Sequence, residues 1–302
     1  MSLSEKIGIV ILNYLNYRDT LECLESLSVL KYENKLVVVV ENGSPNDSPE
    51  KLTRYLSGAK DILLVKNGRN EGFARGNNTG IVRALECGCD HVLVVNNDTV
   101  FTDRYMISKL LEAANQTQAA VLGPSIAGRN PKYQNPFQIS TSLGNVLVNL
   151  RTTILELTRL VYAGSFVKQQ LRRLRLIRPA RLATSAEEVP KAARCQIIPE
   201  GFGLHGSAIF FTKRYFQEFN FGFYQGTFLY YEENILRILL KKKMMQMAYV
   251  PETSIYHKEN RSSTVSFGNR RSTIARRLLP SILRCLFVIL VPVRFLKISR
   301  KH

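Results

Sequence analysis

The chain has 302 residues, of which 45% are hydrophobic and 22% are charged, and its formal net charge is +18. This composition excludes an intrinsically disordered chain, and the length allows one large α/β domain with additions or two small domains. The five cysteines include no CxxC pair, and their spacing fits neither a zinc site nor a disulfide framework, so we expect reduced thiols in a cytosolic setting. The first residues lead directly into a strand-like segment, and we expect no signal peptide.

Strand-like and helical segments alternate through the first hundred residues. Short apolar runs rich in β-branched residues predict buried strands, and apolar residues at helical spacing predict helices between them. The predicted strands are 7–12, 36–40, 62–65 and 91–95, and the predicted helices are 19–30, 49–56 and 77–86. This alternation predicts a mostly parallel sheet that helices cover on both faces.

Polar residues directly follow three of these strands, at 13–16, 41–44 and 96–98. In open α/β sheets, ligands bind beyond the carboxyl ends of the strands. The three groups therefore predict a nucleotide or phosphate site at one edge of the sheet. They leave the reaction unspecified.

Almost all of the excess positive charge lies in two segments. Residues 151–181 contain eight Lys and Arg and one acid, whereas residues 270–302 contain nine Lys and Arg and no acid. A nucleic-acid enzyme would more often spread its basic residues over the working domain. We therefore expect no nucleic-acid partner.

Both basic segments also contain apolar runs. Residues 150–177 interleave apolar side chains with Arg, which predicts an amphipathic helical insertion. The tail contains nine uncharged residues at 285–293, whereas a membrane-spanning helix needs about 20. We expect a helix in the membrane interface with its Arg and Lys on anionic headgroups. The alternatives are a tail that packs on the folded core, an oligomer contact, or a tail that binds RNA.

Six pieces of sequence carry further information: VVVVENGSPNDS, NEGFARGNNTGI, VLVVNNDTVF, FGLHGSAIFFTKRYFQEFNFGF, FLYYEEN and PETSIYH. In their order and spacing they resemble family 2 glycosyltransferases, especially the rhamnosyltransferase-like branch, over roughly residues 5–125 and 200–260. The resemblance implies an α/β GT-A fold, with a Rossmann-like and mainly parallel sheet, to which the basic helical insertion and the C-terminal amphipathic tail are added. The implied parts are a catalytic domain at 1–260, comprising a nucleotide-sugar-binding half at 1–128, an insertion at 129–199 and an acceptor-side half at 200–260, and a membrane-associating tail at 261–302.

The resemblance places Glu41 at the family's acidic position after the second strand, which binds the base or ribose and is usually Asp. A carboxylate can accept a hydrogen bond from the N3–H of uracil or thymine, or from a ribose hydroxyl. The other residues expected around the nucleotide sugar are Asn13, Asn16, Asn42, Ser44, Gly72, Arg75, Asn78 and Asn97. Taken alone, residues 41–44 also fit a turn after a strand, and residues 70–78 also fit a helix N-terminus with a solvated Arg.

The triplet Asn96-Asn97-Asp98 takes the place of the family's metal-binding acidic motif, which is often Asp-x-Asp. The resemblance makes Asp98 a ligand of Mg²⁺ or Mn²⁺, which would neutralise charge on the departing nucleoside diphosphate. His257, at the end of PETSIYH, is a second candidate ligand because a neutral imidazole suits a metal. Without the resemblance, the triplet also fits a turn at a strand end.

The segment YYEEN at 230–234 matches the family's aromatic-x-Glu-Asp segment, whose second acid is the general base. Glu233 stands at that position, with Glu in place of Asp, and Glu232 is the second candidate. An inverting transfer needs one base to take the acceptor hydroxyl proton while that oxygen attacks the anomeric carbon. The downstream Asp that often follows in the family is replaced by Ile235. By themselves, both acids also fit the first turn of a helix at 232–241.

We therefore expect an inverting glycosyltransferase that moves a sugar from dTDP-rhamnose or a UDP-sugar to a lipid-linked saccharide in surface polysaccharide biosynthesis. We expect it to be peripheral on the cytoplasmic face of the cell membrane. One alternative is a non-catalytic nucleotide-sugar-binding scaffold subunit. Another is a nucleotidylyltransferase, although the residues after the first strand lack the Gly-rich, basic signature of such enzymes.

Overall fold

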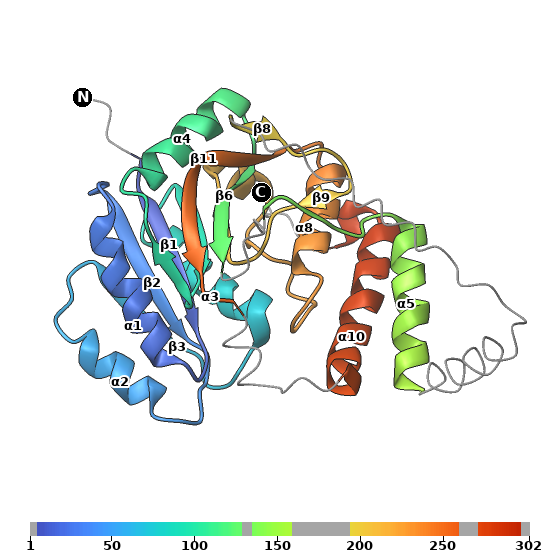
Figure 1. Cartoon of the computed structure of the whole chain (residues 1–302), viewed down its shortest axis with the longest axis horizontal. Coiled ribbons are helices and arrows are strands. Elements are labelled where there is room, and N and C mark those ends of the chain that lie inside the picture. The colour runs from blue at the N-terminus through green and yellow to red at the C-terminus, as the bar shows by residue number, and fades with distance from the viewer. Residues whose placement is uncertain (1–4, 129–134, 159–193, 260–270, 297–302) are drawn as a thin grey trace, which may run out of the picture.

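The computed structural model describes residues 5–128, 135–158, 194–259 and 271–296 (Figure 1). Within these residues a nine-stranded sheet has the order β3-β2-β1-β4-β10-β6-β11-β5, with β8 beside β11, and β7 pairs separately with β9. The strands are β1 (Ile7–Asn13), β2 (Lys35–Glu41), β3 (Ile62–Lys66), β4 (His91–Asn96), β5 (Thr99–Phe101), β6 (Val121–Gly128), β7 (Phe137–Gln138), β8 (Gln196–Ile197), β9 (Phe202–Gly203), β10 (Ala208–Phe211) and β11 (Met247–His257).

Most of the sheet is parallel, as the sequence predicts. The strands β3, β2, β1 and β4 run in one direction, and β11 runs parallel to β6. Among the described strands, β10 lies between β4 and β6 and is antiparallel to both, and the short strands β5 and β8 are antiparallel to β11. The carboxyl ends of β1, β2 and β4 therefore meet at one edge of the sheet, where the three predicted polar groups follow them.

Helices cover both faces of the sheet (Figure 1). One core contains residues of α1 (Tyr17–Ser26), α2 (Ser48–Tyr55) and α4 (Met106–Thr117), and the other contains residues of α3 (Gly72–Glu86), α7 (Lys213–Glu218) and α8 (Glu232–Lys242). Strand β1 contributes to both: Ile9 and Ile11 join the first core and Val10 joins the second. Successive side chains of a strand point to opposite faces, so a continuous apolar run fills both layers.

Helix α3 begins at Gly72, whereas the sequence predicts a helix only from residue 77. The backbone of Gly72 has a φ of +82°, and its N–H donates to Asn70 Oδ1 at 2.9 Å. An added Cβ at Gly72 would lie 2.4 Å from the carbonyl oxygen of Phe228. The prediction was wrong about this start because glycines in the first turns interrupt the apolar period on which it relied.

The expected helix at 19–30 is shorter than predicted. Helix α1 ends at Ser26, and a 3₁₀ turn, η1 (Leu27–Val29), follows it. Of the insertion expected at 129–199, the structure describes residues 135–158, which include β7 and helix α5 (Leu143–Leu157), and residues 194–199, which include β8. Most of the predicted amphipathic segment at 150–177 lies outside the described residues.

The predicted tail contains helix α10 (Arg271–Leu290), which lies beside α5 at one end of the molecule and contacts α8 (Figure 1). Ile282, Cys285 and Val288 of α10 join the core that contains α8. One face of the tail thus packs on the folded core, which was one of the alternatives above. Among the residues described, no helix has the length and apolar character needed to cross a membrane.

Candidate active site

Glu41 ends β2 and is buried. Its carboxylate accepts hydrogen bonds from the backbone N–H groups of Gly43 at 3.1 Å and Ser44 at 2.9 Å. The Ser44 hydroxyl in turn accepts from the N–H of Leu15 at 2.9 Å, which ties the β2 turn to the segment after β1. Glu41 therefore organises the turn. Because an ionised carboxylate has about four lone-pair sites, it retains acceptor capacity for a ligand.

Asn13 ends β1 and is the register partner of Glu41 across the β1–β2 pair. Its Oδ1 accepts from the Thr20 hydroxyl at 2.8 Å. Its buried Nδ2 has no hydrogen-bond partner among the residues that the structure describes. A buried amide donor without a partner is costly, and such a group beside a buried carboxylate suits a ligand that offers both a carbonyl oxygen and an N–H.

Asn16 and Asn97 stabilise the backbone near this corner. Asn16 is the N-cap of α1, and its side chain accepts from the N–H of Asp19. Asn97 Nδ2 donates to the carbonyl of Asn16 at 3.0 Å and to the Thr20 hydroxyl at 3.1 Å. The structure thus brings Asn13, Asn16 and Asn97 together around Thr20.

Asn42 anchors the loop that leads into α3. Its Nδ2 donates to Asn70 Oδ1 at 3.1 Å and to the Gly72 carbonyl at 3.3 Å. Its Oδ1 accepts from Asn67 Nδ2 at 2.9 Å and from the N–H of Glu71 at 3.2 Å. These four contacts hold the glycine-containing loop against the end of β2.

Arg75 and Asn78 on α3, which the sequence predicts to contact the nucleotide, contact the segment at 222–225. Arg75 Nε donates to the carbonyl of Gln225 at 3.0 Å, and its guanidinium lies 3.7 Å from Glu71. The buried amide of Asn78 accepts from the N–H groups of Gly222 and Phe223 and donates to the Phe223 carbonyl at 2.6 Å. Both residues thus join α3 to the segment at 222–225.

Asp98 and His257 meet at the end of β4 and β11, with 3.2 Å between Asp98 Oδ1 and His257 Nε2, and both side chains are almost fully buried. The His205 ring lies beside them, 5.5 Å from the His257 ring between centroids. Burial, with a smaller contribution from His257, lowers the pKa of His205 to about 4, so this imidazole is neutral at neutral pH. The sequence assigned no role to His205.

Lys258 supports this corner from the residue after His257. Its backbone N–H donates to the Asp98 carbonyl at 3.0 Å, and its ammonium contacts Asp19 at 2.8 Å and also Glu22. Burial lowers the pKa of Lys258, but the two carboxylates outweigh burial and the net pKa is raised. A single Lys after a strand gives no sequence signal for this pairing, because its partners lie on α1.

Glu232 and Glu233 form the first turn of α8. The two residues before them, Tyr230 and Tyr231, have φ values of +73° and +71°. Left-handed backbone at bulky residues is strained, and such strain persists only where surrounding contacts hold it. This corner directs Glu233 Oε1 toward the backbone N–H of Gly206, which donates to it at 3.0 Å.

The two carboxyl groups differ in their contacts. Glu232 is buried, and its Oε1 has no hydrogen-bond partner in the described part of the chain. Burial, and then the neighbouring charge of Glu233, raise the pKa of Glu232 to about 8, so it is mainly protonated at neutral pH. Burial also raises the pKa of Glu233. The sequence made Glu233 the first candidate base and Glu232 the second, and the two carboxyl groups have different contacts in the structure.

The turn at 205–207 joins the acidic corner to Asp98 and His257. Gly206 binds Glu233, while the preceding His205 lies against His257. The N–H of Asn96, at the end of β4, donates to the Ser207 carbonyl at 3.0 Å. An added Cβ at Gly206 would lie 2.7 Å from Glu233 Oε1, so glycine permits this approach. One turn therefore connects the predicted metal ligands to the predicted base.

Residues 8–171 match the family model described as Glycosyl transferase family 2, which is more than half of the chain. The chain belongs to glycosyl transferase family 2. A relative of this family 2 chain is the dTDP-rhamnosyl transferase RfbF of Shigella flexneri, which is 29% identical over 123 residues. That match spans 40% of this chain and 40% of the relative's length.

Solved structures resemble this family 2 chain at low sequence identity. GalNAc-T7 with UDP, GalNAc and Mn²⁺ has a TM-score of 0.59 at 11% identity, covering 86% of this chain and 45% of that one. Residues 1–349 of S. aureus TarS in complex with UDP have a TM-score of 0.52 at 10% identity, covering 98% of this chain and 67% of that one. These likenesses show the fold, and it is the GT-A fold expected from the sequence.

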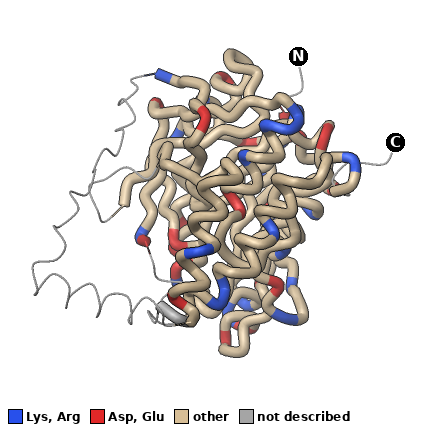
Figure 2. The backbone as a smooth tube through the Cα atoms, turned by 90° about the vertical axis from the view of Figure 1, so that its right-hand side faces the viewer, with Lys and Arg blue, Asp and Glu red and all other residues tan. Residues whose placement is uncertain are grey.

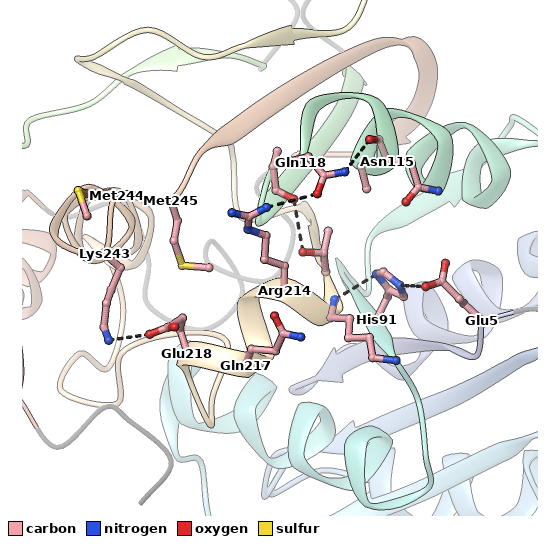
Figure 3. A pocket seen from close by; sticks show the side chains of 14 residues that line it. Glu5, His91, Asn115, Gln118, Arg214, Gln217, Glu218, Lys243, Met244 and Met245 are labelled. Carbon is pink, nitrogen blue, oxygen red and sulfur yellow. Dashed lines mark hydrogen bonds and ion pairs between the residues drawn. The ribbon is translucent and has the colours of Figure 1, made fainter. Parts of the chain in front are cut away.

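A separate hollow of about 500 Å³ lies at the opposite edge of the sheet, near the start of β4 and the end of α4 (Figure 3). Two pairs of its lining side chains are in contact: His91 Nε2 lies 3.2 Å from Glu5, and Lys243 Nζ lies 2.7 Å from Glu218. None of the predicted site residues of this family 2 chain lines it. The hollow is therefore distinct from the candidate active site.

Proposed function

We propose that this chain is an inverting, metal-dependent glycosyltransferase that moves a sugar from a nucleoside diphosphate to a lipid-linked saccharide. The observation that carries the proposal is the turn at 205–207, which connects Glu233 to the Asp98–His257 pair. An inverting transfer needs a base on one side of the donor sugar and charge neutralisation at the leaving diphosphate on the other. Both kinds of group lie around this turn.

The proposed donor is dTDP-rhamnose, with UDP-sugars next. The relative with rhamnosyl transferase in its name supports the first, and solved neighbours with UDP support the second. The unpartnered Nδ2 of Asn13 and the carboxylate of its register partner Glu41 offer one donor and one acceptor. The imide edge of uracil or thymine presents a carbonyl oxygen and an N–H, which is the complementary pair.

Asp98 and His257 are the proposed holders of Mg²⁺ or Mn²⁺. Among the described residues, no group of three or more His, Cys, Asp or Glu side chains is arranged to hold a metal. A carboxylate and an imidazole together fit a cation that takes its remaining ligands from a diphosphate and water, as Mg²⁺ commonly does. When bound, the metal would neutralise charge on the departing nucleoside diphosphate.

Glu233 is the proposed base, and it takes the proton from the attacking acceptor hydroxyl. Burial raises the pKa of Glu233, and a carboxylate with a raised pKa is a stronger base than a free glutamate. The N–H of Gly206 fixes Oε1 of this carboxylate. Glu232 is mainly protonated at neutral pH, so it is less suited to accept a proton.

The proposed acceptor is a saccharide on a lipid carrier, and the proposed location is peripheral on the cytoplasmic face of the cell membrane. Two basic segments that also contain apolar runs support this location. The proposed role is surface polysaccharide biosynthesis.

The test is a donor screen that measures release of the nucleoside diphosphate from a panel of sugar nucleotides. It uses Mg²⁺, Mn²⁺ or EDTA, membrane extract as acceptor, and the variants Asp98→Ala and Glu233→Gln. We expect metal-dependent turnover of one donor, greatly reduced in both variants. Donor binding by calorimetry without any turnover would instead indicate a non-catalytic nucleotide-sugar-binding subunit, and an absence of donor binding would reject the proposal.

A further inference from the structure

The exposed hydrophobic side chains of this chain are concentrated at one end. Of the fifteen large hydrophobic side chains that are exposed among the described residues, eight lie on α5, α10 and the short helix η2 (Val293–Phe295). The most exposed of these eight are Val148, Leu290 and Phe295, which have 62%, 65% and 62% of their surface accessible. Single exposed apolar residues are ordinary, whereas a gathering on neighbouring helices marks an interaction surface.

Helix α10 has two distinct faces. Ile282, Cys285 and Val288 are buried, whereas Leu283, Phe287 and Leu290 are exposed. The exposed three are spaced four and three residues apart, so they form a stripe on one side of the helix. The packing of α10 on the core therefore leaves its second apolar stripe facing outward.

Helix α5, which lies beside α10, also has one buried and one exposed apolar face. Val146 is buried, while Leu143, Leu147 and Ile154 are exposed at helical spacing. Helices α5 and α10 contact each other and lie side by side in Figure 1, and Figure 2 looks onto this end of the molecule. The two exposed apolar stripes therefore lie on neighbouring helices that contact each other.

Positive charge accompanies the apolar stripes. The sequence of α5, and of α10 through residue 296, contains six arginines and one acid. Arg284 lies over the Phe287 ring at 5.6 Å from its centroid, and Arg294 lies over the Phe295 ring at 4.9 Å. These contacts place guanidinium groups directly beside exposed aromatic side chains. A second copy of the same surface would oppose arginine to arginine, whereas an anionic lipid surface complements both the charge and the apolar stripes.

We propose that the outer surface of α5, α10 and η2, the basic apolar face, docks on an anionic membrane surface. Its Leu and Phe side chains enter the headgroup boundary, and its arginines bind lipid phosphates. This inference rests on the proposed peripheral location and names the surface responsible. Because α10 contacts α8, which carries Glu233, the acceptor side of the candidate active site then lies near the bilayer.

The experiment is vesicle flotation of the full chain, with vesicles rich in phosphatidylglycerol compared with vesicles of phosphatidylcholine alone. The apolar variant is Leu283→Ser with Phe287→Ser, and the charge variant is Arg276→Gln with Arg284→Gln. The matched control is Val29→Ser with Tyr55→Ser, which removes exposed apolar side chains elsewhere. Circular dichroism confirms that each variant is folded.

We expect the wild type and the control to bind the anionic vesicles and to be released by salt. We expect the apolar variant to bind about tenfold more weakly or worse, and the charge variant to lose much of its salt dependence. A wild type that binds neither kind of vesicle would reject the peripheral location itself. Binding that neither variant weakens would reject only the assignment to this face. A wild-type dimer that the apolar variant dissociates, without vesicle binding, would show that the face covers a second copy.

Discussion

The side-chain amide of Asn149, on α5, donates a 2.7 Å hydrogen bond to the phenolic oxygen of Tyr231. Tyr231 precedes the two acids of α8 and has left-handed backbone. The same amide donates to the Ser140 hydroxyl at 3.1 Å, and Asn234 Nδ2 donates to the Ser140 carbonyl at 2.9 Å. Residues before and on α5 therefore hold the strained corner that presents Glu233.

Removing this hydrogen bond should loosen the corner. We expect Tyr231→Phe to lower the free energy of unfolding by about 1 kcal/mol, measured by urea unfolding. We also expect it to lower kcat more than it raises the KM for the sugar nucleotide, because Glu233 is less well positioned. Thr152→Ala, at an exposed position of α5, is the control. A Tyr231→Phe variant that loses stability but keeps its kcat would show that the contact is only structural.

The stability of the chain should depend on pH through Glu232. Burial, and then the charge of Glu233, raise its pKa from 4.5 to about 8, so between these values the folded chain holds a proton that the unfolded chain has released. The stabilising contribution of this proton is complete at pH values below the pKa of Glu232 in the unfolded chain. It is lost as the pH rises through the pKa of Glu232 in the folded chain. The free energy of unfolding should therefore fall by up to about 1.4 kcal/mol per pH unit in this window.

We expect Glu232→Gln, which stays neutral, to reduce this decline, while the raised pKa of Glu233 leaves a remaining slope. Urea unfolding at about pH 5.5 and about pH 7.5 measures the slope. Glu50→Gln, at an exposed position of α2, should keep the wild-type slope. Equal slopes in the wild type and Glu232→Gln would mean that Glu232 is not the group that titrates.

Gly72→Ala should destabilise the chain through backbone strain and through a steric clash. Gly58→Ala introduces the backbone strain alone and therefore serves as the comparison. Gly72 and Gly58 have φ values of +82° and +85°, but only at Gly72 would a Cβ meet another group, the Phe228 carbonyl at 2.4 Å. We expect Gly58→Ala to lower the unfolding free energy by about 1 kcal/mol, from the backbone alone. Gly72→Ala should cost more, because the start of α3 must also move from Phe228. Equal losses of stability in thermal or urea unfolding would contradict the clash.

Asn13 should contribute to binding of the nucleotide through its unpartnered Nδ2. We expect Asn13→Ala to weaken binding of UDP or dTDP by roughly 5- to 30-fold, which corresponds to about 1–2 kcal/mol for one buried hydrogen bond. Calorimetry with the nucleoside diphosphate measures this, and Asn145→Ala at an exposed position of α5 is the control. Unchanged affinity in Asn13→Ala would show that Asn13 does not contribute to nucleotide binding and serves only in its hydrogen bond with Thr20.

Local patterns in the sequence determined the first four strands, their parallel arrangement and the edge at which the polar residues gather. An apolar run such as 7–12 needs burial on both faces whatever packs against it, and this requirement is visible in one segment alone. The position of Asn13 beside Glu41 follows from the same pattern, because both end adjacent parallel strands.

The tertiary structure decided the contacts between segments that are distant in the sequence. Asn149 and Tyr231 are 82 positions apart, and Lys258 and Asp19 are 239 apart. Neither pair leaves a local pattern, because periodicity tells which face of an element is buried and not which element covers it. For the same reason, only the packed structure distinguished Glu233, held by Gly206, from the adjacent and chemically identical Glu232.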